Sequence, residues 1–208
     1  MNNNIYYTIK NEKSTEIKVK GSKFIGYIKS VNSTDQAEKY IEFISSKNYN
    51  ATHNCTAYKI GIGDKAIYRY NDDGEPSGTG GRPILDAIEV QQLTNIVGVV
   101  TRYFGGTKLG TGGLSRAYRN CIEQTILRAG KRKIYITDIL SVNFSYELTG
   151  IIMELVEKFN CKIISKKYGT DTTIKLKIKK SQSEQFKQLL FHNTGAKISI
   201  KEEDNESA

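Results

Sequence analysis

The chain has 208 residues, of which 38% are hydrophobic, 25% are charged and only two are proline. This composition is typical of a globular protein, and the length allows one large domain or two small ones. No apolar run approaches the roughly 18 residues that span a bilayer, and the polar residues 1–10 lack the apolar core of a signal peptide. We therefore expect a cytoplasmic protein with no membrane partner.

The formal net charge is +9, and most of the excess lies in the second half of the chain. Residues 131–201 carry 14 basic and 6 acidic groups. A basic half favours a polyanionic partner such as RNA. A lysine-rich solvated surface would give the same composition, so charge alone leaves both interpretations open.

Three cysteines, Cys55, Cys121 and Cys161, stand far apart and form no C-x-x-C pair. They predict neither a disulfide framework nor a zinc site, and free buried thiols are the expected state. Nothing in the sequence implies a resident metal or another cofactor.

The hydrophobic pattern predicts alternating strands and helices in the first part of the chain. In chain order we expect a hairpin of residues 16–19 and 24–29 turning at Gly21-Ser22, a helix capped by Ser33 or Thr34, strands over residues 56–60 and 66–70, a helix from Pro83 to Leu93, a buried strand over residues 95–102 and a long helix from Leu114 that ends at Gly130.

After the basic residues 131–133 the pattern changes to β-α-β-β-α-β, which is the ferredoxin-like plan. Ser181 and Glu184 form a sequence capping box for its second helix. We expect an α+β protein of two α/β-sandwich domains, with boundaries at residues 1–134 and 135–202. The acidic residues 203–208 are expected to be a disordered tail.

Twelve of the eighteen glycines fall between Gly61 and Gly113, mostly in two loops. The first loop, residues 71–83, contains Asp72, Asp73 and Glu75, which could act as acid or base or hold a divalent metal. His53 is the remaining catalytic candidate in this half. Simple turn chemistry is the alternative, because Asp-Gly, Ser-Gly and Gly-Gly pairs all favour turns.

The second loop, residues 102–113, leads directly into the long helix. A glycine-rich turn at a helix N-terminus presents unpaired N–H groups and the positive end of the helix dipole, which together suit a phosphate. The alternative to anion binding is structural: Arg119 and Glu123 stand four residues apart on the helix and can form an ion pair with each other. The residues expected to bind an anion or a nucleic acid are Arg82, Arg102, Tyr103, Gly105, Gly106, Lys108, Gly112, Gly113, Arg116 and Arg119.

These two loops also carry a family resemblance. The segments DDGEPSGT (72–79), GRPIL (81–85) and VVTRYFGGTKLGTGGL (99–114), followed by Arg116-Ala117-Tyr118, resemble the IMPACT family. Lys23-Phe24-Ile25 and residues 51–55 match its earlier motifs, and the length is similar to the bacterial YigZ-like branch. Thr56 and Gly80 depart from the family pattern, which usually has tryptophan and alanine there.

The resemblance implies a first domain like domain 2 of ribosomal protein S5 and a ferredoxin-like second domain. It also implies a setting near translation, because eukaryotic relatives regulate translation. They do so through an extra N-terminal domain that this chain lacks, so that protein partner does not carry over. The bacterial branch has no settled biochemical role.

Two functions follow as hypotheses. The first is a non-catalytic RNA- or ribosome-associated binding protein that uses the basic second loop, with the lysine-rich second domain extending the surface. The second is an enzyme for a small phosphorylated ligand, in which the Asp72–Glu75 carboxylates act, and it requires a pocket shared by both loops. A protein-partner adaptor with Tyr103 and Phe104 as exposed anchors is a third reading. The oligomeric state stays open.

Overall fold

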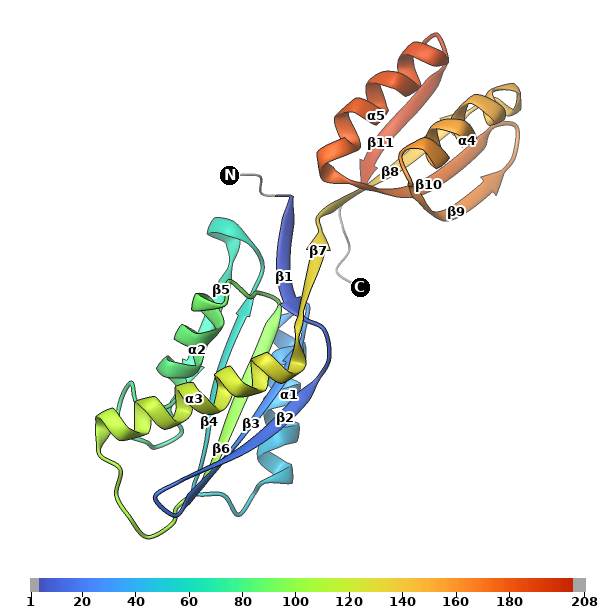
Figure 1. Cartoon of the computed structure of the whole chain (residues 1–208). Helices are drawn as coiled ribbons and strands as arrows, with labels where there is room; N and C mark the ends of the chain where they lie inside the picture. Colours follow the sequence, from blue (N-terminus) through green and yellow to red (C-terminus); the bar gives the residue numbers. More distant parts are fainter. Residues whose placement is uncertain (1–3, 204–208) are drawn as a thin grey trace. The chain divides into compact units, whose positions relative to one another are not determined.

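The structure, a computed structural model, describes residues 4–203 and divides the chain after Ile134 (Figure 1). The N-terminal unit runs from Tyr6 to Ile134, and the C-terminal unit begins at Tyr135 and also includes Ile5. Both units combine helices with antiparallel sheet. The expected two-domain α+β fold is therefore confirmed.

A five-stranded antiparallel sheet forms the centre of the N-terminal unit, with the strand order β2-β3-β6-β4-β5. Its strands are β2 (Lys13–Val19), β3 (Ser22–Ser30), β4 (His53–Ile60), β5 (Ile67–Asn71) and β6 (Ile96–Tyr103), with the short 3₁₀ turn η1 (Gly63–Lys65) between β4 and β5. Every residue of β6 except Tyr103 is buried. A continuous apolar run is what a central strand covered on both faces requires.

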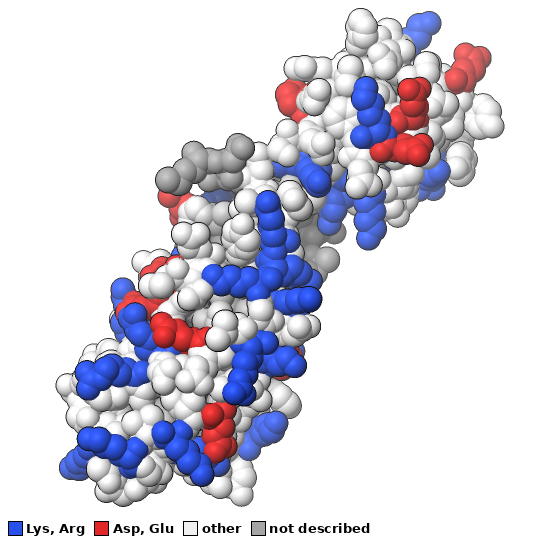
Figure 2. Space-filling view, viewed as in Figure 1, with Lys and Arg blue, Asp and Glu red and all other residues white. Residues whose placement is uncertain are grey.

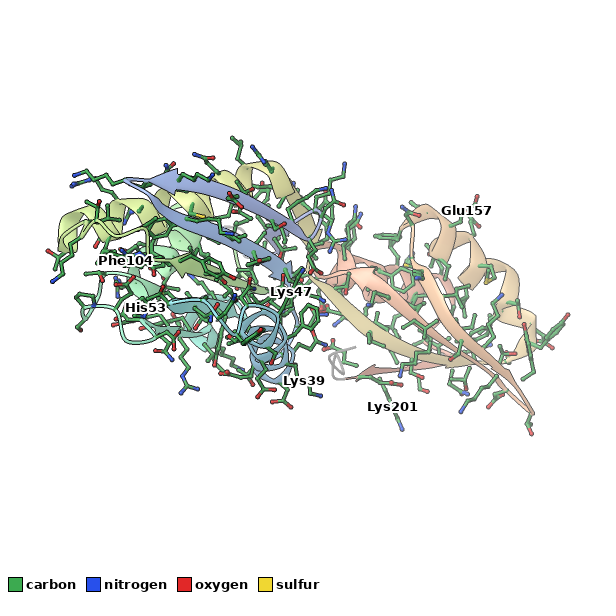
Figure 3. All side chains as sticks on the ribbon, turned by 90° about the horizontal axis from the view of Figure 1, so that it is seen from below. Lys39, Lys47, His53, Phe104, Glu157 and Lys201 are labelled. Carbon is green, nitrogen blue, oxygen red and sulfur yellow. The ribbon has the colours of Figure 1, made fainter. Side chains whose placement is uncertain are left out.

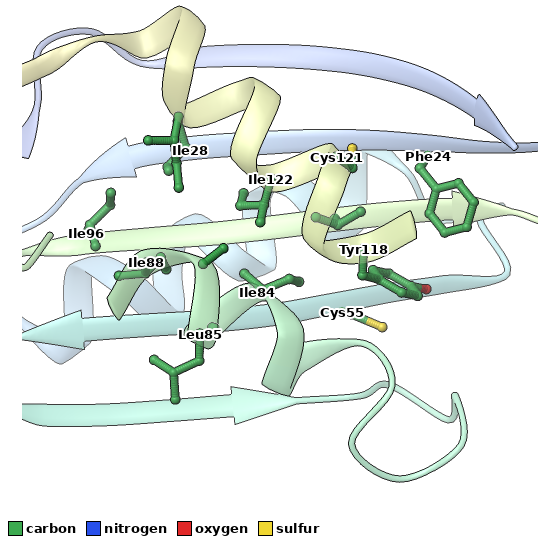
Figure 4. Close-up of a cluster of buried hydrophobic side chains, with 14 of the residues drawn as sticks. Phe24, Ile28, Cys55, Ile84, Leu85, Ile88, Ile96, Tyr118, Cys121 and Ile122 are labelled. Carbon is green, nitrogen blue, oxygen red and sulfur yellow. The ribbon is translucent and has the colours of Figure 1, made fainter. Parts of the chain in front are cut away.

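Helices cover both faces of this sheet. The helices α2 (Gly81–Val90) and α3 (Thr111–Ala129) pack on one face, where Tyr118, Ile122, Ile84 and Ile88 join the main core (Figure 4). On the other face α1 (Thr34–Lys47) contributes Ala37, Tyr40 and Ile44 to a second core. The apolar positions therefore follow the helical spacing that the sequence predicts.

The helix ends follow local sequence chemistry. The Ser33 hydroxyl accepts the N–H of Gln36 at 3.2 Å and caps α1. Gly130 ends α3 at φ 69°, a left-handed conformation that glycine adopts without steric cost. Helix α2 begins at Gly81 and ends at Val90, so it starts and stops earlier than the sequence predicts.

One ribbon was not predicted. Strand β1 (Ile5–Ile9) pairs with β7 (Lys131–Tyr135) as a separate two-stranded sheet. Strand β7 is mostly basic, and the short β1, Ile-Tyr-Tyr-Thr-Ile, consists of strand-forming residues without a regular alternation of apolar and polar side chains, so the pattern did not predict this ribbon. The pairing also changes the expected boundary, since Ile5 clusters with the C-terminal unit and not with residues 6–134.

The C-terminal unit has the expected ferredoxin-like order. Its elements are β8 (Thr137–Phe144), the 3₁₀ turn η2 (Tyr146–Leu148), α4 (Thr149–Lys158), β9 (Lys162–Tyr168), β10 (Thr172–Lys179), α5 (Lys180–Asn193) and β11 (Ile198–Glu203). The strand order is β11-β8-β10-β9. Leu140, Val142, Ile174 and Leu176 pack against α4 and α5, so both helices cover the same face of the sheet.

Two expectations for this unit need comment. The Ser181–Glu184 capping box is wrong, because α5 already begins at Lys180 and no side chain caps it. Of the expected acidic tail, Glu203 is the last residue of β11, and residues 204–208 lie outside the described part of the chain. No helix within residues 4–203 is long and apolar enough to cross a membrane.

Gly26 gives a test of how closely α3 packs on β3. A Cβ at Gly26 would lie 2.4 Å from the Thr125 hydroxyl oxygen and 3.2 Å from the Cys121 sulfur. We expect Gly26→Ala to lower the free energy of unfolding by about 1–3 kcal/mol through overpacking. In the control Gly150→Ala, where nothing lies within 4 Å, stability should stay equal or rise by up to about 1 kcal/mol. Chemical denaturation followed by circular dichroism measures both, and equal stability of the two variants would contradict this packing.

Candidate functional site

The two glycine loops meet at one end of the N-terminal unit and enclose a cavity of about 470 Å³. Figure 3 shows His53 and Phe104 close together at this end. The cavity is lined by Thr52 and His53 at the start of β4, Glu75 and Pro76 of the first loop, Arg102 of β6, Phe104, Lys108, Leu109 and Gly110 of the second loop, and Thr111 and Leu114 of α3. The shared pocket required by the small-ligand hypothesis is therefore present.

Asp72 and Asp73 do not line this cavity, because their carboxylates bind the backbone. Asp72 accepts the N–H groups of Gly78, Gly80 and Gly81 at 2.8–2.9 Å, and so it caps the start of α2. Asp73 accepts the N–H of Asn54 at 2.6 Å. These contacts correct the catalytic assignment: both aspartates fold the loop, as turn chemistry predicts.

Glu75 and Arg102 form a buried ion pair that joins the first loop to β6. The Arg102 Nη1 donates to Glu75 Oε1 at 2.6 Å, and both side chains are at least 94% buried. Tyr118 of α3 donates its hydroxyl to the same oxygen at 2.8 Å. The Arg102 guanidinium also lies 5.5 Å from the ring centres of Phe24 and Phe104. Arg102 is thus part of the interior, which corrects its expected place on a basic surface.

His53 is held by a backbone carbonyl. Its Nδ1 lies 2.7 Å from the carbonyl oxygen of Asp73. A carbonyl can only accept, so Nδ1 must carry the hydrogen. The Nε2 is then the nitrogen left for the cavity, 3.9 Å from Glu75 Oε2. Neutral His53 therefore offers an acceptor to a bound molecule at Nε2.

Cys55 lies beneath this network and is not a nucleophile. Its thiol donates to the Asp72 carbonyl at 3.0 Å. Burial, with a smaller contribution from the nearby acidic side chains, raises the pKa of the thiol to about 12. A Cβ on Gly80 would lie 2.3 Å from this sulfur, so glycine suits the position here. Burial likewise raises the pKa of Tyr118 well above its usual range.

The mouth of α3 keeps unpaired amides. Gly110 precedes the helix at φ 70° and provides no side-chain cap, and the first intrahelical bond runs from the Leu114 N–H to the Gly110 carbonyl. Within residues 4–203, the N–H groups of Thr111, Gly112 and Gly113 therefore have no acceptor. None of the described carboxylates accepts a hydrogen bond from these amides.

The cations around this mouth differ in their availability. Lys108 lines the cavity, and Arg116 lies beside Gly112, whose added Cβ would be 3.4 Å from the Arg116 Nη1. In the described chain neither has an ion-pair partner. Arg82 and Arg119 both pair with Asp86. The Arg82 Nε lies 2.7 Å from Asp86 Oδ1, and the Arg119 Nη2 lies 3.1 Å from Asp86 Oδ2. Neither lines the cavity, and the expected pair of Arg119 with Glu123 is replaced by this bridge between α2 and α3.

Three other predicted residues have structural contacts. A Cβ on Gly105 would lie 1.9 Å from the Gly21 backbone, so Gly105 permits the second loop to touch the β2–β3 turn. Gly106 has φ 87° and supplies a left-handed turn. The Tyr103 hydroxyl donates to Asn48 at 3.1 Å, which ties β6 to α1. Phe104, about half exposed, is the aromatic residue that faces the cavity.

The open face of the C-terminal sheet is a second candidate surface. Alternate residues of its strands point away from the core, and most of these are polar. Six lysines lie on this face: Lys162, Lys167, Lys175, Lys177, Lys179 and Lys201. Among the strand residues of the face, Glu203 is the only acid, and it pairs with Lys175.

The helix-covered side of this unit has a balanced charge. Helices α4 and α5 carry Glu154, Glu157, Glu184, Lys158, Lys180 and Lys187. Figure 2 shows acidic and basic side chains mixed over the part of this unit that faces the viewer. In Figure 3, Lys201 lies on the side of the sheet away from Glu157 on α4. The positive excess of the unit therefore gathers on the open face of the sheet.

Removing the charge of Glu75 should expose the cost of burying Arg102. We expect Glu75→Gln to lower the free energy of unfolding by about 3–5 kcal/mol, because a buried guanidinium loses its counter-charge. Glu75→Gln combined with Arg102→Met should lose less than the two single variants summed. A double-mutant cycle by chemical denaturation measures this coupling, and additive losses would show that the pair does not interact.

The thiols give a test in alkaline solution. Burial raises the pKa of Cys55 and Cys121 to about 12. Their contribution to stability is complete below the ordinary thiol pKa and falls as the pH rises towards 12. At about pH 9 we expect iodoacetamide to label both cysteines slowly in the native protein and rapidly in urea, because the thiolate is the reactive form. Mass spectrometry reads the sites, and rapid native labelling of Cys55 would contradict its burial.

Comparison with known proteins agrees with the resemblance in the loops. The Impact N-terminal domain family matches residues 20–126. The chain is 34% identical to the IMPACT family member YvyE of Bacillus subtilis, over 95% of this chain and 90% of that protein. It is 33% identical to the IMPACT family member YigZ of Escherichia coli, over 72% of this chain and 74% of that protein. A crystal structure titled as that of a hypothetical protein, 24% identical, has a TM-score of 0.71 over 98% of this chain and 99% of that chain, which shows the fold. The chain therefore belongs to the IMPACT family.

Proposed function

We propose that this protein binds RNA without catalysis, through the open face of its C-terminal sheet, and acts in association with ribosomes or other translation RNA. The observation that carries the proposal is the lysine cluster on a sheet face that no helix of the unit covers. Phosphate contacts by lysine supply most of the affinity in non-specific nucleic-acid binding.

The register of the strands strengthens this argument. Lys177 of β10 lies directly opposite Lys162 of β9. Like charges in directly opposed positions destabilise a sheet. An anionic partner would remove this repulsion, so the arrangement is more favourable in a complex than in the free protein.

The residues between the lysines suit a nucleic-acid backbone. Ser141, Asn143, Thr173 and Ser199 occupy central positions of the open face. Their short polar groups can donate to phosphate oxygens and to the 2′-hydroxyl. In the described strands the centre of this face carries no aromatic residue on which bases could stack, which favours contact with the backbone rather than reading of sequence. The translational setting implied by the family resemblance favours RNA over DNA.

The structure changes the role of the N-terminal basic residues in this proposal. Arg102 is neutralised by Glu75, and Arg82 and Arg119 share the single carboxylate of Asp86. Only Lys108 and Arg116, of the cations expected at the second loop, lack such a partner within residues 4–203. The polyanion surface is therefore assigned to the C-terminal unit, and the second loop is not required for it.

Charge reversal at Lys177 tests the proposal. We expect Lys177→Glu to weaken binding of a labelled single-stranded RNA several-fold, and to reduce the slope of log affinity against log salt by about 1. The same change converts a repulsive cross-strand pair into an attractive one, so the fold should keep its stability or gain a few tenths of a kcal/mol. Fluorescence anisotropy at several salt concentrations measures the binding.

Lys158→Glu on the helix-covered side is the matched control, because it makes the same charge change in the same unit. It should leave RNA affinity unchanged, apart from a small stability cost at the end of α4. Equal weakening by both variants would show a general charge effect, and no weakening by Lys177→Glu would refute the proposed surface.

A further inference from the structure

The cavity between the two glycine loops combines an apolar wall with polar groups. Pro76, Phe104, Leu109 and Leu114 provide the apolar lining. His53 presents Nε2 as its available nitrogen, and Thr111 and Lys108 mark the mouth of α3. A cavity of about 470 Å³ with a mainly apolar wall and a few placed polar groups is typical of small-molecule sites.

The polar end favours an anion. The unpaired N–H of Thr111, at the positive end of a long helix, lines the cavity together with Lys108, and Lys108 has no carboxylate partner in the described chain. Glu75 is the acidic residue of the lining, and its charge is balanced by Arg102. The local field at the helix mouth is therefore positive.

Arg102 forms part of the wall of this cavity. Its side chain is 94% buried and lines the cavity, yet its Nε has no hydrogen-bond partner within residues 4–203. The Nη groups are satisfied by Glu75 and Ser22. This Nε is closed off from solvent, so it reduces the stability of the wall and is not a contact for the bound molecule.

We propose that this cavity binds a small phosphomonoester, with its phosphate at the N–H of Thr111 in the mouth of α3, beside Lys108. Its apolar part lies against Phe104 and Leu109, and a hydroxyl or N–H of the ligand donates to His53 Nε2. A phosphomonoester is favoured over a phosphodiester because it carries nearly two negative charges near neutral pH. The site is separate from the lysine face that the proposed function uses.

Phenyl phosphate is the probe, because it joins a phosphate to one apolar ring. We expect it to bind more tightly than either inorganic phosphate or phenol in isothermal titration calorimetry. The chain has only two histidines, so NMR can follow them separately. Phenyl phosphate has no hydroxyl or N–H for Nε2, but its ring current should shift the ring signals of His53, which lines the cavity, and those of His192 should not move. Unmoved His53 signals, or phenyl phosphate binding no better than inorganic phosphate, would overturn the site.

Thr111→Glu is the decisive variant. An acidic residue in the first turn complements the helix dipole, and this turn has no acid at present, so the variant should fold normally. Its carboxylate occupies and repels the anion seat, and we expect affinity for phenyl phosphate to fall by at least about tenfold. Asn120→Asp, on the same helix and outside the cavity lining, makes the same charge change and should bind as the unmodified protein does. Equal affinity of the two variants would contradict the assigned phosphate position.

Two further arms identify the source of the phosphate and separate this site from the lysine face. A 5′-phosphorylated dinucleotide should compete with phenyl phosphate no better than a free nucleoside monophosphate does. Stronger competition by the dinucleotide would replace the small ligand with an RNA end. The Lys177→Glu variant should bind phenyl phosphate as tightly as the unmodified protein, whatever its effect on RNA binding. A loss of phenyl phosphate affinity in this variant would contradict the assignment of two separate sites.

Discussion

The buried ion pair between Glu75 and Arg102 is the interaction on which the candidate site depends. A charged pair this deep is stable only with good geometry and further hydrogen bonds. Tyr118 of α3 and Ser22 of β3 provide them. The pair therefore fixes four parts of the chain together: the first loop, the central strand, the long helix and the start of β3. Glu75 and Arg102 both line the cavity, so the pair also forms part of its wall.

The positive charge of the protein falls into two kinds of site. In the N-terminal unit, Glu75 neutralises Arg102, and Arg82 and Arg119 share the carboxylate of Asp86, while the second loop keeps a small positive helix mouth beside an apolar wall. Such a site suits one compact anion. In the C-terminal unit, six lysines spread over a sheet face with one glutamate. Such a face suits an extended polyanion.

Sequence pattern predicted the fold well, because apolar spacing directly reflects which faces are buried. It found the buried strand β6, the long helix α3 and the ferredoxin-like order. It missed β7, which is mostly basic, and β1, a short run of strand-forming residues that shows no alternation. It also misplaced Arg102 and Tyr103, which look like surface residues until Glu75 and Asn48 are brought beside them. Spacing along the chain does not reveal which acid meets which base, nor that Gly105 touches Gly21. Five residues singled out from the sequence do line the cavity: His53, Glu75, Arg102, Phe104 and Lys108.

The most direct measurement of the central ion pair is the NMR behaviour of the Arg102 guanidinium. A guanidinium fixed by Glu75 and Ser22 and enclosed between Phe24 and Phe104 should rotate slowly and exchange its protons slowly with water. We expect one arginine of the native protein to show separate Nη–H signals that vanish in Glu75→Gln. If every arginine gives the averaged, rapidly exchanging signals of an exposed side chain, the ion pair does not hold the site together.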